Sequence, residues 1–372
     1  MSELQILYAA FVVLYLLQCV VWIPQDSPAF RPAFLGGWMQ AGEGFRLAAQ
    51  RIRGVAGNPL PPLIGVAVCQ PTLVAVSPAG VAPARGGTQK FASFAGMEGV
   101  TAVTKSVCIG DDKLLKAGSE GDAKRLAAWL EKLRTMPEKK RGFAIETRLG
   151  DSLDFTQASA RYVEFERATQ FLGWACTALF AYLFLFLPLI IDAIGLARMW
   201  MVLAAALVLL MAFIHWQFVR VHKRLRPEDG DARWTALFTM LLYPVAAIRA
   251  KDAVLHDLFA EFHPLAAARV LCEPEEFRRV AARTLREIAY PLPASAAASD
   301  EPGVQCESWF RERQLAAIHR FLKDAELKPE ELLAAPAPNS AQSVSYCPRC
   351  CQQYAVPPGV CADCGGIPLH PL

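Results

Sequence analysis

Apolar residues gather in three long uncharged runs, and each run predicts a membrane-spanning helix. The runs cover residues 6–23, 171–191 and 199–219. At about 1.5 Å of rise per residue, each is long enough to cross a hydrocarbon core about 30 Å thick. A cleaved signal peptide is the alternative for the first run, but no basic residue precedes it and no small-residue cleavage site follows it. We therefore expect three spans, of which the first is a retained anchor.

A fourth apolar run, residues 234–248, is short for a span. It contains Pro244 and is flanked by Arg233 and Arg249. This pattern favours an interfacial, re-entrant or buried helix over a further crossing. A crossing here would also place the C-terminal tail on the opposite side of the membrane.

The polar region between the first two spans, residues 24–170, mixes strand and helix patterns. Residues 24–58 predict a connector, and residues 63–82 predict one or two strands. Residues 100–109 are rich in β-branched side chains and predict one strand, with a turn at 110–112 and a hairpin partner at 113–118. Ser119 then predicts the start of an amphipathic helix, which Pro137 ends. We expect a small α+β unit.

The polar region after the third span, residues 220–333, has helical periodicity. Amphipathic helices are predicted over residues 252–263, from Pro274 through residue 289, and over residues 309–322. Residues 291–303 and 334–345 are rich in Ala, Pro and Ser and predict linkers.

Basic residues set the expected orientation. Arg198 alone lies in the link between the second and third spans, and the other lysines and arginines lie between the first two spans or after the third. Because positively charged flanks stay in the cytoplasm, the N-terminus is expected outside and both polar regions inside. The expected location is an inner (plasma) membrane of the bacterial type.

The C-terminal residues carry two Cys-x-x-Cys pairs, Cys347 with Cys350 and Cys361 with Cys364. Two residues between the cysteines of a pair let both sulfurs face one metal, and four thiolates make a closed tetrahedral Zn²⁺ site with no open position for a water nucleophile. So short a segment buries too little apolar surface to fold alone, and metal binding stabilises it. Such a zinc is structural.

Residues 346–372 resemble the zinc-ribbon family on these two pairs. The resemblance implies that Cys347, Cys350, Cys361 and Cys364 are the four ligands. Cys351 departs from the family pattern: it is either free or replaces Cys350 in a shifted pair. A dithiol redox role is the alternative to metal binding.

These elements predict a mixed membrane protein with three transmembrane α-helices, a small α+β cytoplasmic unit, a helical cytoplasmic region and a C-terminal zinc ribbon. The expected divisions are an anchor at residues 1–23, the α+β region at 24–170, a transmembrane hairpin at 171–219, the helical region at 220–333, a linker at 334–345 and the ribbon at 346–372.

The sequence favours no catalytic activity. It contains no Walker loop, no G-x-G-x-x-G and no G-x-S-x-G motif. The leading interpretation is a membrane-anchored scaffold or regulatory protein that recruits protein partners through its helices and its ribbon. A transporter subunit is another interpretation, but the spans lack the pairs of ionisable groups that an ion path needs. The remaining alternative is a membrane-bound enzyme whose site combines four residues, His215, Asp252, His256 and His263.

The charge distribution disfavours a nucleic-acid partner. The formal net charge is only +3, and in the ribbon the single basic residue, Arg349, is offset by Asp363. The expected partners are therefore the lipid bilayer and other proteins, with no small-molecule substrate indicated.

Overall fold

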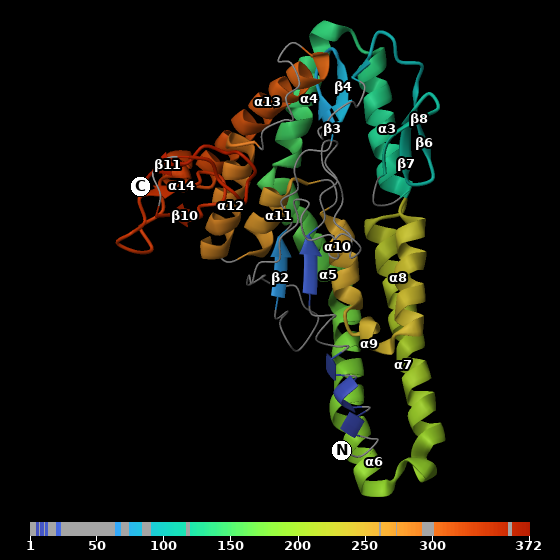
Figure 1. Cartoon of the computed structure of the whole chain (residues 1–372). Coiled ribbons are helices and arrows are strands. Elements are labelled where there is room, and N and C mark those ends of the chain that lie inside the picture. The colour runs from blue at the N-terminus through green and yellow to red at the C-terminus, as the bar shows by residue number, and fades with distance from the viewer. Residues whose placement is uncertain are drawn as a thin grey trace.

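The computed structural model describes residues 5–6, 8–10, 12–13, 20–23, 64–67, 74–83, 91–116, 120–259, 262–272, 274–291, 301–355 and 359–372. Figure 1 shows an elongated molecule: a long helical hairpin extends from a layer of shorter helices and small sheets, and the C-terminal segment lies at one side of that layer. We call this layer the polar layer; it comprises the helices and small sheets within residues 74–152 and the helices within residues 250–333.

The hairpin is made of two long helices joined by a tight turn. Its first arm is α5 (Phe155–Ala181), a π-helical turn η1 (Tyr182–Phe186) and α6 (Leu187–Ile194); its second arm is α7 (Leu196–Leu225). Gly195 makes the turn with φ 86°, a left-handed conformation that glycine adopts without strain. Both arms, Phe155–Ile194 and Met199–Leu225, are long and apolar enough to cross a membrane. The second and third predicted runs therefore form helices of the expected kind.

Both arms also continue beyond their apolar runs into the polar layer. The expected division at residue 170 lies inside α5, so the hairpin and the polar layer share continuous helices. Lys251 in α10 (Ala250–Leu258) is buried and pairs with Glu166 of α5 at 3.0 Å, within this shared part.

A third transmembrane helix is not shown. Residues 5–6, 8–10 and 12–13 are helical, and the edge of the Tyr8 ring packs on Phe184 of η1 with 6.2 Å between ring centroids. The prediction that the helix reaches residue 23 is wrong: Val20–Ile23 form strand β1, which pairs in parallel with β2 (Ile64–Ala67). β-branched side chains favour this conformation once a partner strand supplies the backbone hydrogen bonds. The rest of the run lies outside the described residues.

The two three-stranded sheets of the polar layer are antiparallel. β3 (Val74–Val76), β4 (Gly80–Pro83) and β5 (Ala92–Ser93) form one sheet in that order. β6 (Val100–Val103), β7 (Ser106–Ile109) and β8 (Asp112–Lys116) form another, on which α3 (Glu120–Thr135) packs. The hairpin partner of residues 106–109 is confirmed, but residues 100–109 are two strands, because the chain reverses at Thr104 with φ 52°. The predicted connector at residues 24–58 and the cap at Ser119 lie outside the described residues.

Helices make up the rest of the polar layer. α4 (Glu138–Ser152) has no counterpart among the predicted helices. α11 (Pro264–Leu271), α12 (Pro274–Ala289), α13 (Pro302–Asp324) and α14 (Pro329–Leu333) follow α10. The predicted helix at 252–263 ends early, at Leu258, and α13 begins inside the predicted linker 291–303. The apolar stripe expected on α12 is confirmed: Phe277, Val280, Ala281 and Leu285 are buried.

One hydrophobic core joins the regions on either side of the hairpin in sequence. α13 packs on β3 and β4, and the Cys306 thiol lies 3.5 Å from the carbonyl oxygens of Ala75 and Gly80. The buried cluster continues from this sheet through the helices into the hairpin. The two polar regions therefore lie at the same end of the hairpin.

After α7 the chain folds back along the hairpin before it enters the polar layer. α8 (Gly230–Leu242) runs beside α7, α9 (Pro244–Ala247) makes the turn, and α10 returns beside α5 (Figure 1). The predicted fourth apolar run is thus divided between two helices, neither of which meets the criteria for a span.

The C-terminal segment is a small three-stranded antiparallel sheet. β9 (Ser345–Tyr346) lies between β10 (Gln353–Tyr354) and β11 (His370–Pro371). The predicted linker 334–345 is held against this sheet, because the Gln353 side chain accepts from the Asn339 amide at 2.8 Å and donates to the Ala337 carbonyl at 2.7 Å.

Candidate metal centre

Two tight turns bring the four predicted cysteines together. The first follows β9, where the Cys351 amide donates to the Cys347 carbonyl at 2.8 Å. The second holds Cys361 and Cys364. Each pair is followed by a residue in the left-handed conformation, Cys351 with φ 61° and Gly365 with φ 62°. The two turns therefore share a left-handed residue directly after the second cysteine.

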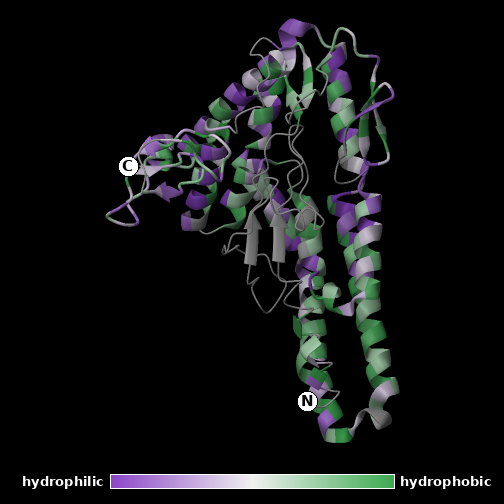
Figure 2. Ribbon diagram, in the orientation of Figure 1, coloured by the Kyte–Doolittle hydropathy of each residue, from purple (hydrophilic) through white to green (hydrophobic). Residues whose placement is uncertain are grey.

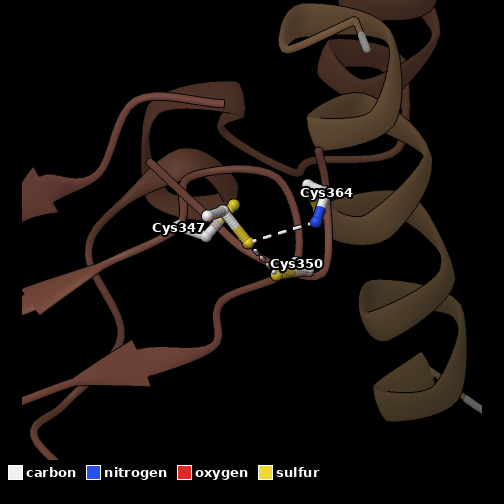
Figure 3. A group of neighbouring side chains, drawn as sticks. Cys347, Cys350 and Cys364 are labelled. Atoms are coloured by element: carbon white, nitrogen blue, oxygen red, sulfur yellow. Dashed lines mark hydrogen bonds between the residues drawn. The ribbon is translucent and has the colours of Figure 1, made fainter. Parts of the chain in front are cut away.

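The sulfur positions fit a metal ion. One sulfur from each of the four cysteines lies within 4.8 Å of the other three, and the group can hold a metal ion. Figure 3 shows three of them, Cys347, Cys350 and Cys364, side by side. A tetrahedral ion with sulfurs at about 2.3 Å requires sulfurs about 3.8 Å apart, and the Cys350 and Cys361 sulfurs are 3.8 Å apart. Cys347, Cys361 and Cys364 are buried, and Cys350 is half-buried.

Burial and hydrogen bonds give Cys350, Cys361 and Cys364 different pKa values. Burial alone would raise the pKa of Cys361, but the Tyr354 hydroxyl at 3.1 Å and the Cys364 amide at 3.3 Å lower that pKa to about 7. Burial raises the pKa of Cys350 to about 11 and also raises the pKa of Cys364. Since a metal binds thiolates, loading this centre displaces protons, and Cys361 releases its proton more readily than Cys350 or Cys364.

Cys351 lies outside the four-cysteine group. Its backbone occupies the position that Gly365 occupies in the second turn, and its thiol is only half-buried. The shifted pairing, in which Cys351 replaces Cys350, does not match this arrangement, because Cys350 is the residue whose sulfur faces Cys361. Cys351 therefore stands where the backbone would favour glycine.

The ribbon is docked on the end of α12 through a residue of its first turn. Arg349 donates from Nη1 to the backbone carbonyls of Glu287 and Tyr290 at 2.7 and 2.6 Å. These carbonyls belong to the C-terminal end of the helix, where carbonyls lack partners within the helix and a positive charge is favourable. The His370 ring packs edge-on against both Tyr290 and Tyr346 at centroid distances of 5.8 and 6.0 Å.

A second arginine fixes the chain that leads to the ribbon. Arg286 donates to the carbonyls of Leu332 and Ala334 at 3.0 and 2.9 Å. Burial lowers the pKa of this guanidinium. The two arginines thus tie α12 to the end of α14 and to the turn that carries Cys347 and Cys350.

The histidines of the alternative enzyme site are on different parts of the molecule. His215 is in α7, with Nδ1 2.7 Å from the Met211 carbonyl. His263 is buried at the start of α11, where its Nδ1 accepts from the Leu265 amide at 3.2 Å. Burial lowers the pKa of His263 to about 3, which keeps the ring neutral. The side chains of Asp252 and His256 are outside the described residues, so their place in this hypothesis is untested.

Sequence reasoning identified the four cysteines but missed Arg349 and Tyr354 as supporting residues. The sequence alone indicates only that Arg349 is too isolated for a phosphate site. The sequence offers one signal for Arg349, a basic residue between the two cysteines of the first pair. Comparisons of the chain with protein-family models, curated proteins and solved structures find no match.

Proposed function

We propose that this protein is a membrane-anchored, non-enzymatic scaffold whose cytoplasmic helices are held in place by a structural zinc ribbon. The observation that carries the proposal is the pair of hydrogen bonds from Arg349 to the end of α12. The residue lies between two ligand cysteines, so the metal orders the same turn that caps the helix. A closed four-thiolate site leaves no coordination position for a substrate, which favours a structural role.

Zinc is the metal we assign to this centre. Four thiolates are a soft, tetrahedral donor set, which favours zinc over magnesium or calcium. An iron–sulfur cluster also takes four cysteines, but the sulfur spacing here matches a single ion bonded directly to all four sulfurs.

The anchor and its orientation are part of the proposal. Two helices are long and apolar enough to span a membrane, and both polar regions pack into one layer at the same end of the hairpin. This packing supports a topology with both regions on one side, which the positive-inside rule assigns to the cytoplasm. In this topology the helical residues at the N-terminus lie beside the hairpin, with the N-terminus outside; the contact of Tyr8 with η1, far from the polar layer, supports that direction.

Metal analysis tests the centre. Purified protein is expected to carry one zinc per chain, and replacement of any of the four ligand cysteines by serine should remove most of it. Cys351→Ser is the matched control, because it alters the neighbouring thiol and leaves the four-sulfur group intact. Loss of zinc in Cys351→Ser with retention in Cys350→Ser would overturn the ligand assignment, and a metal-free wild type would favour the redox alternative.

Topology and partner recruitment need separate measurements. A reporter fused after Leu372 should be active only in the cytoplasm, and one near Ala193 only outside; the opposite result rejects the orientation. For recruitment, proteins cross-linked to the wild type in native membranes are compared with those cross-linked to a chain lacking residues 340–372. A scaffold predicts specific proteins that disappear with the ribbon, and an unchanged profile rejects recruitment through it.

A further inference from the structure

The segment formed by α8 and α9 presents an apolar face that no described part of the chain covers. Trp234, Phe238, Leu241 and Leu242 are exposed, with Trp234 at 68% and Phe238 at 62%. Their spacing of four, three and one residues places them on one side of the helix. We call this set the α8 face. The opposite side of α8 is packed against the protein through Leu237 and Met240, which are buried.

The two threonine hydroxyls on α8 form hydrogen bonds within the helix. Thr235 and Thr239 are exposed beside the α8 face, and each hydroxyl donates to the carbonyl four residues earlier at 2.9 Å. No charged residue occurs between Arg233 and Arg249. Soluble proteins seldom expose a contiguous apolar surface such as the α8 face to water, whereas the same surface is stable in contact with lipid acyl chains.

Contacts with α5 set the depth of the turn. The Cys176 thiol lies 3.4 Å from the Ala247 carbonyl of α9. Cys176 is about 7 Å along the helix axis beyond Phe171, where the apolar run of α5 begins. On the returning helix, Lys251 pairs with Glu166, which lies about 7 Å on the polar side of Phe171. The turn at α9 therefore lies on the membrane side of Phe171, where the apolar run begins, and α10 returns to the polar side of that level.

The length of α8 leads independently to the same depth of the α9 turn within the apolar part of the hairpin. α8 begins close to the end of α7, since the Asp229 amide donates to the Arg226 carbonyl. Leu225, the last residue of α7, lies about 9 Å along the helix axis on the polar side of Val219, where the apolar run ends. α8 runs back along α7 and is about 18 Å long, so Leu242 lies about 9 Å on the membrane side of Val219. In Figure 2, α8 changes from hydrophilic at its start to hydrophobic toward α9, beside the hydrophobic part of α7.

We propose that α8 and α9 form a re-entrant segment that inserts into the cytoplasmic leaflet, with lipid acyl chains covering the α8 face. Backbone that dips into a bilayer is tolerated where protein covers its polar groups, and here α5 and α7 contact α9. Trp234 is placed at the level of the headgroups and Phe238, Leu241 and Leu242 below them, in continuity with the exposed apolar faces of the hairpin. This inference rests on the proposed membrane anchor and goes beyond it, since an anchored hairpin does not require α8 to enter the lipid.

Photolabelling by lipid tests the insertion without any substitution. The full chain is reconstituted in vesicles that contain a phospholipid with a diazirine in the middle of one acyl chain, irradiated, and mapped by tandem mass spectrometry. Phe238 and Leu241 should form adducts at yields within about twofold of Leu209, an exposed residue of α7, since the exposed fractions are similar. Phe143 is the matched control: it is 76% exposed but lies on α4 in the polar layer.

The outcomes separate the two proposals. Labelling of Leu209 but not of the α8 face overturns the re-entrant segment and leaves the anchor standing. Labelling of none of these residues overturns the anchor itself. A second lipid with the diazirine in the headgroup distinguishes depth: adducts on Phe238 and Leu241 from this lipid alone would place α8 on the surface and overturn the insertion.

Discussion

Replacing Arg349 with alanine should release the ribbon from α12 while leaving the metal in place. The guanidinium donates to two carbonyls at 2.7 and 2.6 Å, and it does not contribute a ligand atom. A hydrogen bond with a charged partner contributes about 1.5–3 kcal/mol, and because water replaces the guanidinium in part at this half-buried position, we take about 1–1.5 kcal/mol for each bond. Loss of both bonds should therefore cost about 2–3 kcal/mol of docking free energy.

This cost converts into a measurable change in exchange rate. A difference of about 2–3 kcal/mol raises the equilibrium constant for undocking about 30- to 150-fold. When the ribbon leaves, the last turn of α12 loses its cap, so its amides, including that of Tyr290, should exchange hydrogen for deuterium faster by up to this factor. Hydrogen–deuterium exchange with mass spectrometry, in the presence of zinc, measures it.

Arg278→Ala is the matched control on the same helix. Arg278 pairs with Glu331 at 3.4 Å, and both side chains are 48% exposed. Such a surface pair contributes about 0–1 kcal/mol, so exchange at the end of α12 should change less than about fivefold. Equal exchange in Arg349→Ala and Arg278→Ala would refute the docking argument. Zinc loss in Arg349→Ala would refute it differently, by showing that the arginine maintains the metal site.

Three further changes test other parts of the structure. Cys351→Gly should keep the zinc and stabilise the ribbon by about 1 kcal/mol, because glycine removes the strain of φ 61°; competition with a chelator measures this, and a weaker hold on zinc would contradict it. Gly121→Ala should destabilise α3 and speed amide exchange there, because the added Cβ meets the carboxylate of Asp229. Gly150→Ala adds a Cβ that meets no neighbour and should instead stabilise α4 by about 0.5–1 kcal/mol. Equal effects of the two substitutions would contradict the clash with Asp229. His263 has its ordinary pKa of 6.5 in the unfolded chain and a pKa of about 3 in the folded chain, so the free energy of unfolding decreases as pH falls below 6.5, by about 2 kcal/mol at pH 5. His263→Asn keeps an acceptor at the helix cap but does not titrate in this range. Thermal melts should therefore show that this variant is less sensitive to the change in pH.

The features that sequence predicted well are those with a local cause. An uncharged run such as 199–219 needs no partner to be recognised, because its length and composition alone suit a bilayer. The two Cys-x-x-Cys pairs have the same kind of local cause, although their spacing leaves open whether Cys350 or Cys351 completes the first pair.

The features that sequence missed depend on contacts between distant residues. Val20–Ile23 continue an apolar run, and only pairing with Ile64–Ala67 makes them a strand. Thr104 sits within a β-branched run, and its left-handed backbone divides what one pattern describes as a single strand. The role of Arg349 required the end of α12 to be placed beside the ribbon, which neither segment specifies by itself.

The unbroken passage of α5 from the hairpin into the polar layer gives the molecule a mechanical property. The part of α5 that precedes Phe171 is about 24 Å long, so a change in hairpin tilt of about 10° would displace its far end by about 4 Å. Tilt responds to the match between an apolar stretch and the thickness of the bilayer. With the hairpin in a membrane, α5 acts as a lever that transmits lipid thickness to the position of the helices it carries.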